Sequence, residues 1–404
     1  MLPDLHGMSK TSLALKNLRG VVIILILAFH SFTAYIVSQS TDPPPFDNPP
    51  YTWRAFPIID SERWIGFDLL CAFLFLFLMQ LMFFYLAFLS GRAWYAEGGT
   101  FLVRRVLRLG VPFVVGTYIL MPLAFYPVYR RTAVDPAWSA FWSHWTALPV
   151  SPAGPLWFLW FLLVLDIGAA VLFRFGSRAH FLSSILNKIV ADPARLFTVL
   201  MSVSAVAYFP LAAIYSPWQW VGYGPFEIQA VFAPQYAIYF AAGVAVGACG
   251  LERGLLDMNG MPARRWYYWV LGSLTAFLLW IGPTALIMKG EVTSIGGLQV
   301  AADLSLMIFV GAACFGMIAV LLRYGTVRRR IIDQVSENGY GIYFYHYPVV
   351  LWLQYALLGI AFAAIAKGLV VLIGALSLSL AASILTNRIL STAGPILNKA
   401  GYSI

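Results

Sequence analysis

Long apolar stretches alternate with short polar segments along the whole chain. A hydrocarbon core about 30 Å thick needs around 20 apolar residues for each helical crossing. Stretches of about this length recur from residue 13 almost to residue 390. They predict helices near residues 13–37, 67–90, 103–126, 155–174, 196–215, 231–249, 266–288, 300–323, 340–359 and 368–390. We therefore expect an all-α fold, a polytopic transmembrane bundle of about ten helices.

The composition supports this pattern. Hydrophobic residues make up 61% of the 404 positions and charged residues only 11%, whereas about a quarter of the residues in ordinary soluble domains are charged. Lipid is therefore the expected solvent for most of the chain. We expect a single integral-membrane domain over residues 1–404, and the first apolar segment is too long for a cleaved signal peptide.

The formal charge of +9 could indicate a nucleic acid partner. Membrane proteins, however, collect Lys and Arg at the cytoplasmic ends of their helices. Twenty of the 26 basic residues lie in the tails and the even-numbered loops between the predicted helices, and six lie in the odd-numbered loops. This partition predicts that both termini are cytoplasmic, and it explains the charge without nucleic acid.

The two longest outer segments are residues 38–66 and 127–154. The first contains several prolines, which exclude a long regular helix. The second contains Trp138, Trp142 and Trp145, whose spacings of four and three suit one face of a short interfacial helix. The three cysteines lie far apart in the sequence and form no CxxC pair. We therefore expect no disulfide framework and no metal site.

In the first predicted helix, residues 13–37, the segment Asn17-Leu18-Arg19 is followed by ten residues and then by His30, inside an otherwise apolar run. Arg19 and His30 are eleven residues apart, which is about 20° past three full helical turns and roughly 16 Å of rise. They therefore share a face, with Arg19 at the cytoplasmic boundary and His30 near mid-membrane. The pair could be a cationic anchor for a cytosolic anion with a general base placed deeper. Alternatively, Arg19 snorkels to the interface and His30 bonds to another helix.

Three arginines cluster at the start of the third predicted helix, namely Arg104, Arg105 and Arg108. Spacings of three and four make them neighbours on one helical surface. Arginine forks bind phosphate oxygens in a bidentate way, so the cluster would suit a polyphosphate ligand. Topological anchoring explains the cluster equally well.

Two further titratable residues lie inside predicted helices. His346 is at most about 13 Å from the cytoplasmic end of helix 9, and it could be a second catalytic or positioning residue or a structural one beside its neighbouring tyrosines. Asp166 lies roughly 16 Å from the outer end of helix 4, which matches the depth of His30. The carboxylate could orient the imidazole, as carboxylates do for catalytic histidines.

Taken together, these residues resemble the acyltransferase-3 family of bacterial membrane acyltransferases. The matching pieces span about 340 residues in the expected order: Arg19-x10-His30, FFYLAFLSGR ending at Arg92, FLVRRVLRLGVP with its Arg105-x-x-Arg108, LWFL at 156–159, and YGIYFYHYPV around His346. The outer segment 58–70 also looks like a branch near the glucan succinyltransferases. The resemblance implies about ten helices and an enzyme that transfers acyl groups other than aminoacyl groups.

The resemblance further implies a donor, an acceptor and a set of site residues. The donor would be cytoplasmic acyl-CoA, a substrate rather than a permanent cofactor, with an acetyl or succinyl group. Its phosphates would bind Arg19, Arg105 and Arg108. The acceptor would be a hydroxyl of an envelope glycan at the bacterial inner membrane. His30 would be the catalytic histidine. Our reading of the residues allows it to act as a base or through an acyl-histidine, and keeps Asp166 and His346 as further catalytic candidates. The main rival is a proton-coupled transporter or a lipid flippase.

Overall fold

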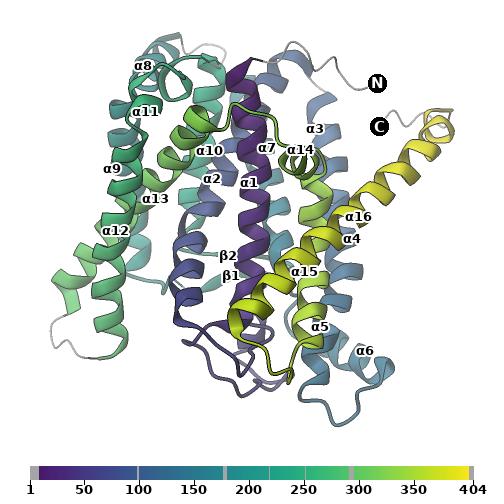
Figure 1. The fold of residues 1–404 in the computed structure, drawn as a ribbon. Coiled ribbons are helices and arrows are strands. Elements are labelled where there is room, and N and C mark those ends of the chain that lie inside the picture. The colour runs from purple at the N-terminus through teal and green to yellow at the C-terminus, as the bar shows by residue number, and fades with distance from the viewer. Residues whose placement is uncertain are drawn as a thin grey trace. The chain divides into compact units, whose positions relative to one another are not determined.

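The computed structural model describes residues 9–97, 100–175, 180–217, 219–250, 252–290 and 295–399 (Figure 1). The chain divides into two compact units. The first unit comprises Met1–Leu18, Phe75–Val111 and Trp157–Arg328, and the second comprises Arg19–Leu74, Pro112–Leu156 and Arg329–Ile404. The expectation of one integral-membrane domain stays a prediction.

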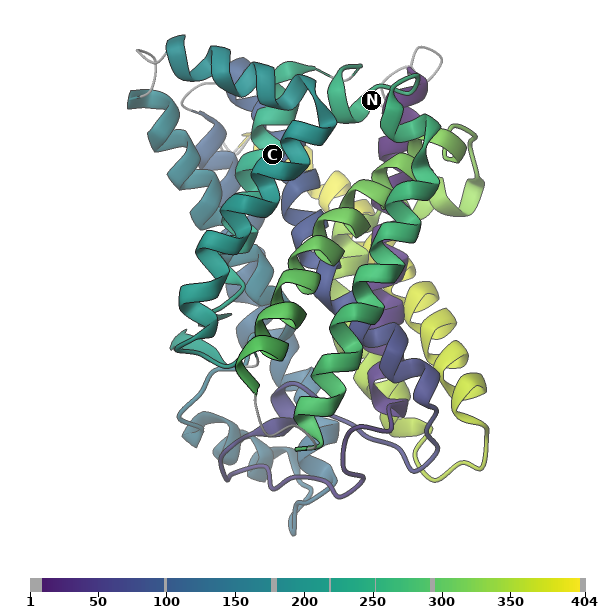
Figure 2. The same ribbon diagram turned by 90° about the vertical axis from the view of Figure 1, so that its left-hand side faces the viewer.

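Helices dominate the first unit. Helices α1, Lys10–Phe32, and α2, Ile65–Glu97, contribute to both units. The other elements of the first unit are α3 Thr100–Arg105, η4 Val106–Gly110, α7 Trp157–Phe175, α8 His180–Ala191, α9 Pro193–Ala212, α10 Ala233–Cys249, η8 Gly254–Leu256, α11 Met261–Arg264, α12 Trp266–Met288 and α13 Ile295–Tyr324. The two strands β1, Trp220–Tyr223, and β2, Phe226–Gln229, form one antiparallel hairpin, in which Trp220 pairs with Gln229 and Tyr223 with Phe226. Helices α12 and α13 run side by side (Figure 2).

Two glycines let α10 approach α2 closely within the first unit. A Cβ atom added at Gly243 would lie 2.1 Å from the carbonyl oxygen of Phe84, and one added at Gly247 would lie 2.6 Å from that of Phe88. Small residues four apart are a common means of close helix packing in membranes, because lipid gives no hydrophobic drive for helix association. The GVAVG sequence of α10 therefore specifies this contact.

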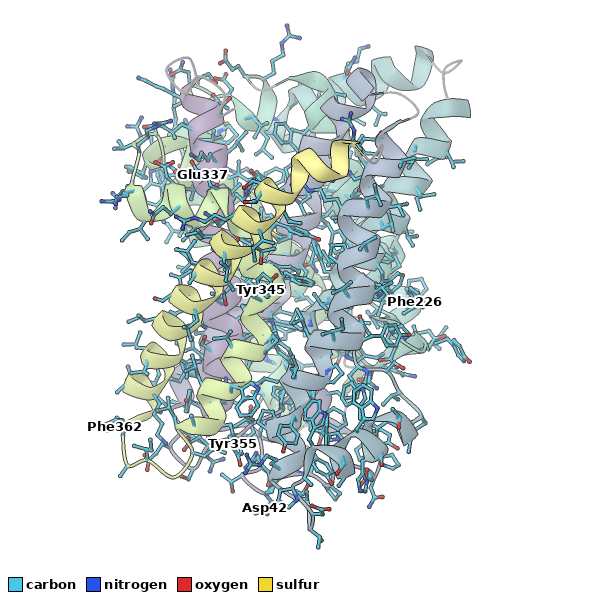
Figure 3. The ribbon with its side chains drawn as sticks, turned by 90° about the vertical axis from the view of Figure 1, so that its right-hand side faces the viewer. Asp42, Phe226, Glu337, Tyr345, Tyr355 and Phe362 are labelled. Carbon is cyan, nitrogen blue, oxygen red and sulfur yellow. The ribbon has the colours of Figure 1, made fainter. Side chains whose placement is uncertain are left out.

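The second unit is also helical. Its elements are η2 Thr33–Tyr35, η3 Thr52–Arg54, α4 Val111–Val115, η5 Gly116–Leu120, α5 Met121–Arg130, α6 Trp138–Ala147, η6 Gly154–Leu156, α14 Arg330–Glu337, α15 Gly339–Ala356 and α16 Ala364–Lys399. Glycine again allows a close contact between helices, because a Cβ atom at Gly341 of α15 would lie 2.2 Å from the hydroxyl oxygen of Ser383 in α16. Figure 3 shows α15 from the side, with Tyr345 along it and Tyr355 near its end.

Each of the ten predicted helix windows coincides with a helix of the described chain. Eight helical stretches are long and apolar enough to cross a membrane, and a ninth span results if α10 and the bent segment Gly254–Arg264 count as one. Helix α15 fills the remaining window, is not among these spans, and carries several tyrosines, His346 and Gln354. The predicted all-α polytopic bundle is confirmed.

The predicted outer segments are ordered around an aromatic core in the second unit. Within residues 38–66 the rings of Phe46 and Trp53 stack with centroids 4.7 Å apart, and Trp53 packs on Phe125 of α5 at 5.2 Å. The tryptophan pattern forms α6, as expected. Trp138 and Trp142 are exposed, whereas the ring of Trp145 stacks on Phe125 at 5.8 Å. The aromatic rings thus hold the proline-rich segment against α5.

Candidate active site

Two histidines face each other in the second unit. His30 comes from α1 and His346 from α15, and their ring centroids are 5.2 Å apart with a tilt of 43°. The sequence singled out both residues as candidates but did not predict that they meet. The structure brings them together, since α1 and α15 lie side by side in this unit and run in the same direction.

The parallel course of these helices also places Arg19. One Nη atom of Arg19 donates to the carbonyl oxygen of Glu337 at 3.4 Å, just before α15 begins. A Cβ atom at Gly339 would lie 3.4 Å from Nε of Arg19. Arg19 and His30 therefore both face α15, as their shared helical face predicted. Arg19 lies at the start of α15 and His30 lies beside its middle.

His346 is completely buried, and one of its ring nitrogens is engaged. Nδ1 lies 2.6 Å from the carbonyl oxygen of Tyr343, one turn earlier in α15. Tyr343 in turn donates its hydroxyl to the carbonyl oxygen of Pro155. Nε2 of His346 has no hydrogen-bond partner within the described part of the chain. The ring is therefore anchored on one side and available on the other.

His30 has an aromatic surrounding and a fixed backbone. Its ring contacts those of Phe29 and Tyr347 edge-on, with centroids 4.9 and 5.3 Å away. Its carbonyl oxygen accepts hydrogen bonds from Gln354 and Thr33, each at 2.9 Å. Unlike His346, the residue is partly exposed. His30 is therefore the less buried ring of the pair.

Arg105 and Asp166 meet in the first unit. Nε of Arg105, at the end of α3, lies 3.2 Å from a carboxylate oxygen of Asp166 in α7. Asp166 is fully buried, while the side chain of Arg105 is 17% exposed and also stacks over the ring of Phe101 at 5.0 Å. Arg108 follows in η4 and is exposed. Two of the predicted phosphate ligands therefore lie three residues apart on one surface.

The pairing gives Asp166 a neighbour that the sequence did not suggest. A carboxylate beside a guanidinium fixes the direction of the arginine fork. Asp166 and His30 belong to different units, so the suggestion that Asp166 orients His30 stays a prediction.

A buried ion pair in the second unit escaped sequence analysis. Nζ of Lys367, in the first turn of α16, lies 2.8 and 2.9 Å from the two carboxylate oxygens of Asp60. Both side chains are buried, at 0% and 1% exposure. The backbone N–H of Asp60 donates to the carbonyl oxygen of Ala34 at 2.8 Å, one helical turn beyond His30. One sequence signal existed, because Lys367 is the only Asp, Glu, Lys or Arg between Glu337 and Arg388.

Arg131 joins this region from the end of α5. One of its Nη atoms donates to the carbonyl oxygen of Ile59 at 3.1 Å. Burial lowers the pKa of the Arg131 guanidinium below its usual value, and the nearby Asp60 carboxylate opposes that shift. Arg131 and Lys367 thus bind two consecutive residues of segment 38–66, Ile59 and Asp60.

Comparison with known proteins adds the chemistry. The acyltransferase domain model of the acyltransferase-3 family matches residues 12–388, nearly the whole chain. No curated protein and no solved structure matches it significantly. No group of three metal-ligating side chains occurs among the described residues. The match includes both histidines and the three arginines. The chain therefore belongs to the acyltransferase-3 family and is a multi-pass membrane acyltransferase.

Proposed function

We propose that the protein transfers an acyl group from cytoplasmic acyl-CoA to a hydroxyl of a cell-envelope carbohydrate, at the bacterial inner membrane. The observation that carries the proposal is the contact between His30 of α1 and the buried His346 of α15. Arg19, eleven residues before His30 in α1, faces the same helix. A base set about 16 Å beyond a cation suits a donor with a charged head and a long arm. Acyl-CoA has that shape.

The reaction moves one proton from the acceptor hydroxyl to the CoA sulfur, in two transfers through His30. His30 takes the proton from the acceptor hydroxyl as the hydroxyl oxygen attacks the thioester carbonyl carbon. The carbon–sulfur bond then breaks, and the proton passes from His30 to the departing CoA thiolate. This is general acid–base catalysis, which typically contributes 10² to 10⁴-fold, or about 2.7 to 5.4 kcal/mol of activation free energy. The alternative route forms an acyl-histidine first and passes the acyl group to the hydroxyl afterwards.

The donor phosphates are assigned to Arg19, Arg105 and Arg108. Guanidinium forks pair with phosphate oxygens more specifically than ammonium groups do. Asp166 supports the assignment of Arg105, because its buried carboxylate lies 3.2 Å from Nε, at the base of the fork. We therefore assign Asp166 to the positioning of Arg105. The donor is a substrate, and this scheme uses no permanent cofactor and no metal.

Purified protein tests the proposal directly. Incubation with acetyl-CoA or succinyl-CoA in the absence of acceptor is expected to release CoA thiol slowly, because water can take the place of the acceptor hydroxyl. Thiol release is followed with a colorimetric thiol reagent. A proton-coupled carrier or a lipid flippase would release none. Folded protein that neither hydrolyses nor transfers from any acyl-CoA would contradict the proposed donor.

A further inference from the structure

The contact between His346 and Tyr343 determines where the proton of the buried imidazole lies. A carbonyl oxygen can only accept a hydrogen bond, so Nδ1 of His346, 2.6 Å from the oxygen of Tyr343, carries the hydrogen. A neutral imidazole has a single N–H. Nε2 is then a bare acceptor. The backbone of α15 thus sets the tautomer of a side chain that has no exposure to solvent.

Nε2 requires a donor, and His30 is the nearest ring that can supply one. A buried acceptor without a partner is costly, so such atoms usually mark a missing contact. A straight hydrogen bond of about 2.9 Å between two imidazole nitrogens, each about 1.1 Å from its ring centre, places the centroids about 5 Å apart. The observed separation is 5.2 Å. The rings are therefore at bonding separation, and only their orientation must change.

We infer that His346 is a positioning residue that fixes the tautomer of His30. In this arrangement one ring N–H of His30 donates to Nε2 of His346, and the other ring nitrogen of His30 keeps its lone pair for the acceptor hydroxyl. The relay runs from the carbonyl oxygen of Tyr343 through both imidazoles to the substrate. The inference rests on the proposed function, because it specifies how His30 becomes a base.

A histidine in this role differs from the carboxylate that usually orients a catalytic imidazole. A buried carboxylate needs a compensating charge, whereas neutral His346 needs only the carbonyl oxygen of Tyr343. The ring of His30 has Phe29 and Tyr347 beside it. A neutral partner therefore suits these aromatic surroundings. When His30 takes the substrate proton, the lone pair of His346 stabilises the imidazolium without itself accepting the proton.

Two substitutions separate positioning from simple anchoring. Nε2 of histidine and Oε1 of glutamine are both two bonds from Cγ, whereas Nδ1 of histidine and Nδ2 of asparagine are both one bond from Cγ. His346→Gln therefore keeps an acceptor for His30, and His346→Asn keeps the donor to Tyr343. We expect His346→Gln to retain kcat within about tenfold and His346→Asn to lose about 10²-fold, with the KM for acyl-CoA unchanged in both. A kcat of His346→Asn equal to or higher than that of His346→Gln would overturn the inference.

Tyr345→Phe is the matched control in α15, because it removes only a hydroxyl that pairs with Thr386 at 2.9 Å. Its kcat is expected to stay near wild type. His30→Ala distinguishes the failure of the proposed function from the failure of this inference. Full activity in His30→Ala would refute His30 as the base. If His30→Ala loses activity but His346→Asn is at least as active as His346→Gln, only the role of His346 is refuted.

A measurement on the unsubstituted ring covers the case in which the His346 variants do not fold. Nitrogen-15 NMR of histidine-labelled protein is expected to show an unprotonated, hydrogen-bonded Nε2 for His346. That signal should shift in His30→Ala. A His346 signal that is indifferent to His30→Ala would contradict the relay.

Discussion

Each of the two units contains a buried ion pair, and the two pairs differ in how much of the cationic side chain is exposed. In the second unit, Lys367 meets both oxygens of Asp60, and neither side chain is exposed beyond 1%. In the first unit, Asp166 is equally buried, but Arg105, whose Nε lies 3.2 Å from its carboxylate, remains 17% exposed. Both side chains of the Asp60–Lys367 pair are therefore buried, whereas the cationic side chain of the Asp166–Arg105 pair is partly exposed.

This difference separates a structural role from a binding role. A fully buried ion pair contributes little net stability, but the loss of one partner leaves a charge that nothing compensates. Asp60–Lys367 therefore fixes the outer segment to α16. A partly exposed guanidinium held by a carboxylate is oriented and reachable at once, which suits phosphate binding.

The largest expected effect comes from removal of one partner of the buried Asp60–Lys367 ion pair. Lys367→Met leaves the Asp60 carboxylate buried without its cation, which should cost about 3 to 5 kcal/mol of unfolding free energy. Denaturant unfolding in detergent measures the change. The double variant Asp60→Leu with Lys367→Met removes both charges and is expected to recover most of the loss. Wild-type stability in Lys367→Met alone would show that the pair does not hold the outer segment.

Removal of either of two arginines of the first unit, Arg105 or Arg108, should weaken donor binding. Arg105→Ala and Arg108→Ala are each expected to lower acyl-CoA affinity by about 1.5 to 3 kcal/mol, since each loses a charge-assisted hydrogen bond to phosphate. Titration calorimetry measures the affinity. Exposed Arg104 provides a matched control, and Arg104→Ala should change affinity less. Equal affinity in all variants would leave these arginines as topological anchors.

Asp166→Asn distinguishes the two roles available to that carboxylate. If Asp166 orients Arg105, acyl-CoA affinity should fall by about 0.5 to 1.5 kcal/mol, the range of a typical hydrogen bond, while kcat at saturating donor stays unchanged. If it orients His30 instead, kcat should fall and affinity should not. Steady-state kinetics at varied acyl-CoA concentration decide between them.

The smallest predicted effect is the difference between two cations at one position. Arg108→Lys keeps the positive charge but not the bidentate fork, so it should recover part of the affinity that Arg108→Ala loses. The same calorimetric titration measures it. Full recovery by lysine would mean that only charge matters at residue 108, and no recovery would mean that charge does not matter there.

Hydropathy predicted the helices because lipid thickness constrains span length directly. Helical geometry predicted the shared face of Arg19 and His30, because the rotation per residue depends on one segment only. Adjacency between helices is not encoded that way. The contact between His30 and His346 depends on how α1 packs against α15, and no periodicity in either segment reveals it. Asp60–Lys367 was missed for the same reason, because its partners lie 307 residues apart in segments predicted to face water.

The most direct test of the account is the effect of His30→Ala on acyl transfer and on donor binding, measured on the same preparation. If His30 is the base, its loss should lower acyl transfer by about 10² to 10⁴-fold, the usual contribution of a general base. Acyl-CoA affinity should hardly change, because the phosphate ligands are other residues. Insertion should not suffer, since alanine replaces a polar group in an apolar helix. Wild-type transfer by His30→Ala at normal abundance in the membrane would contradict the account.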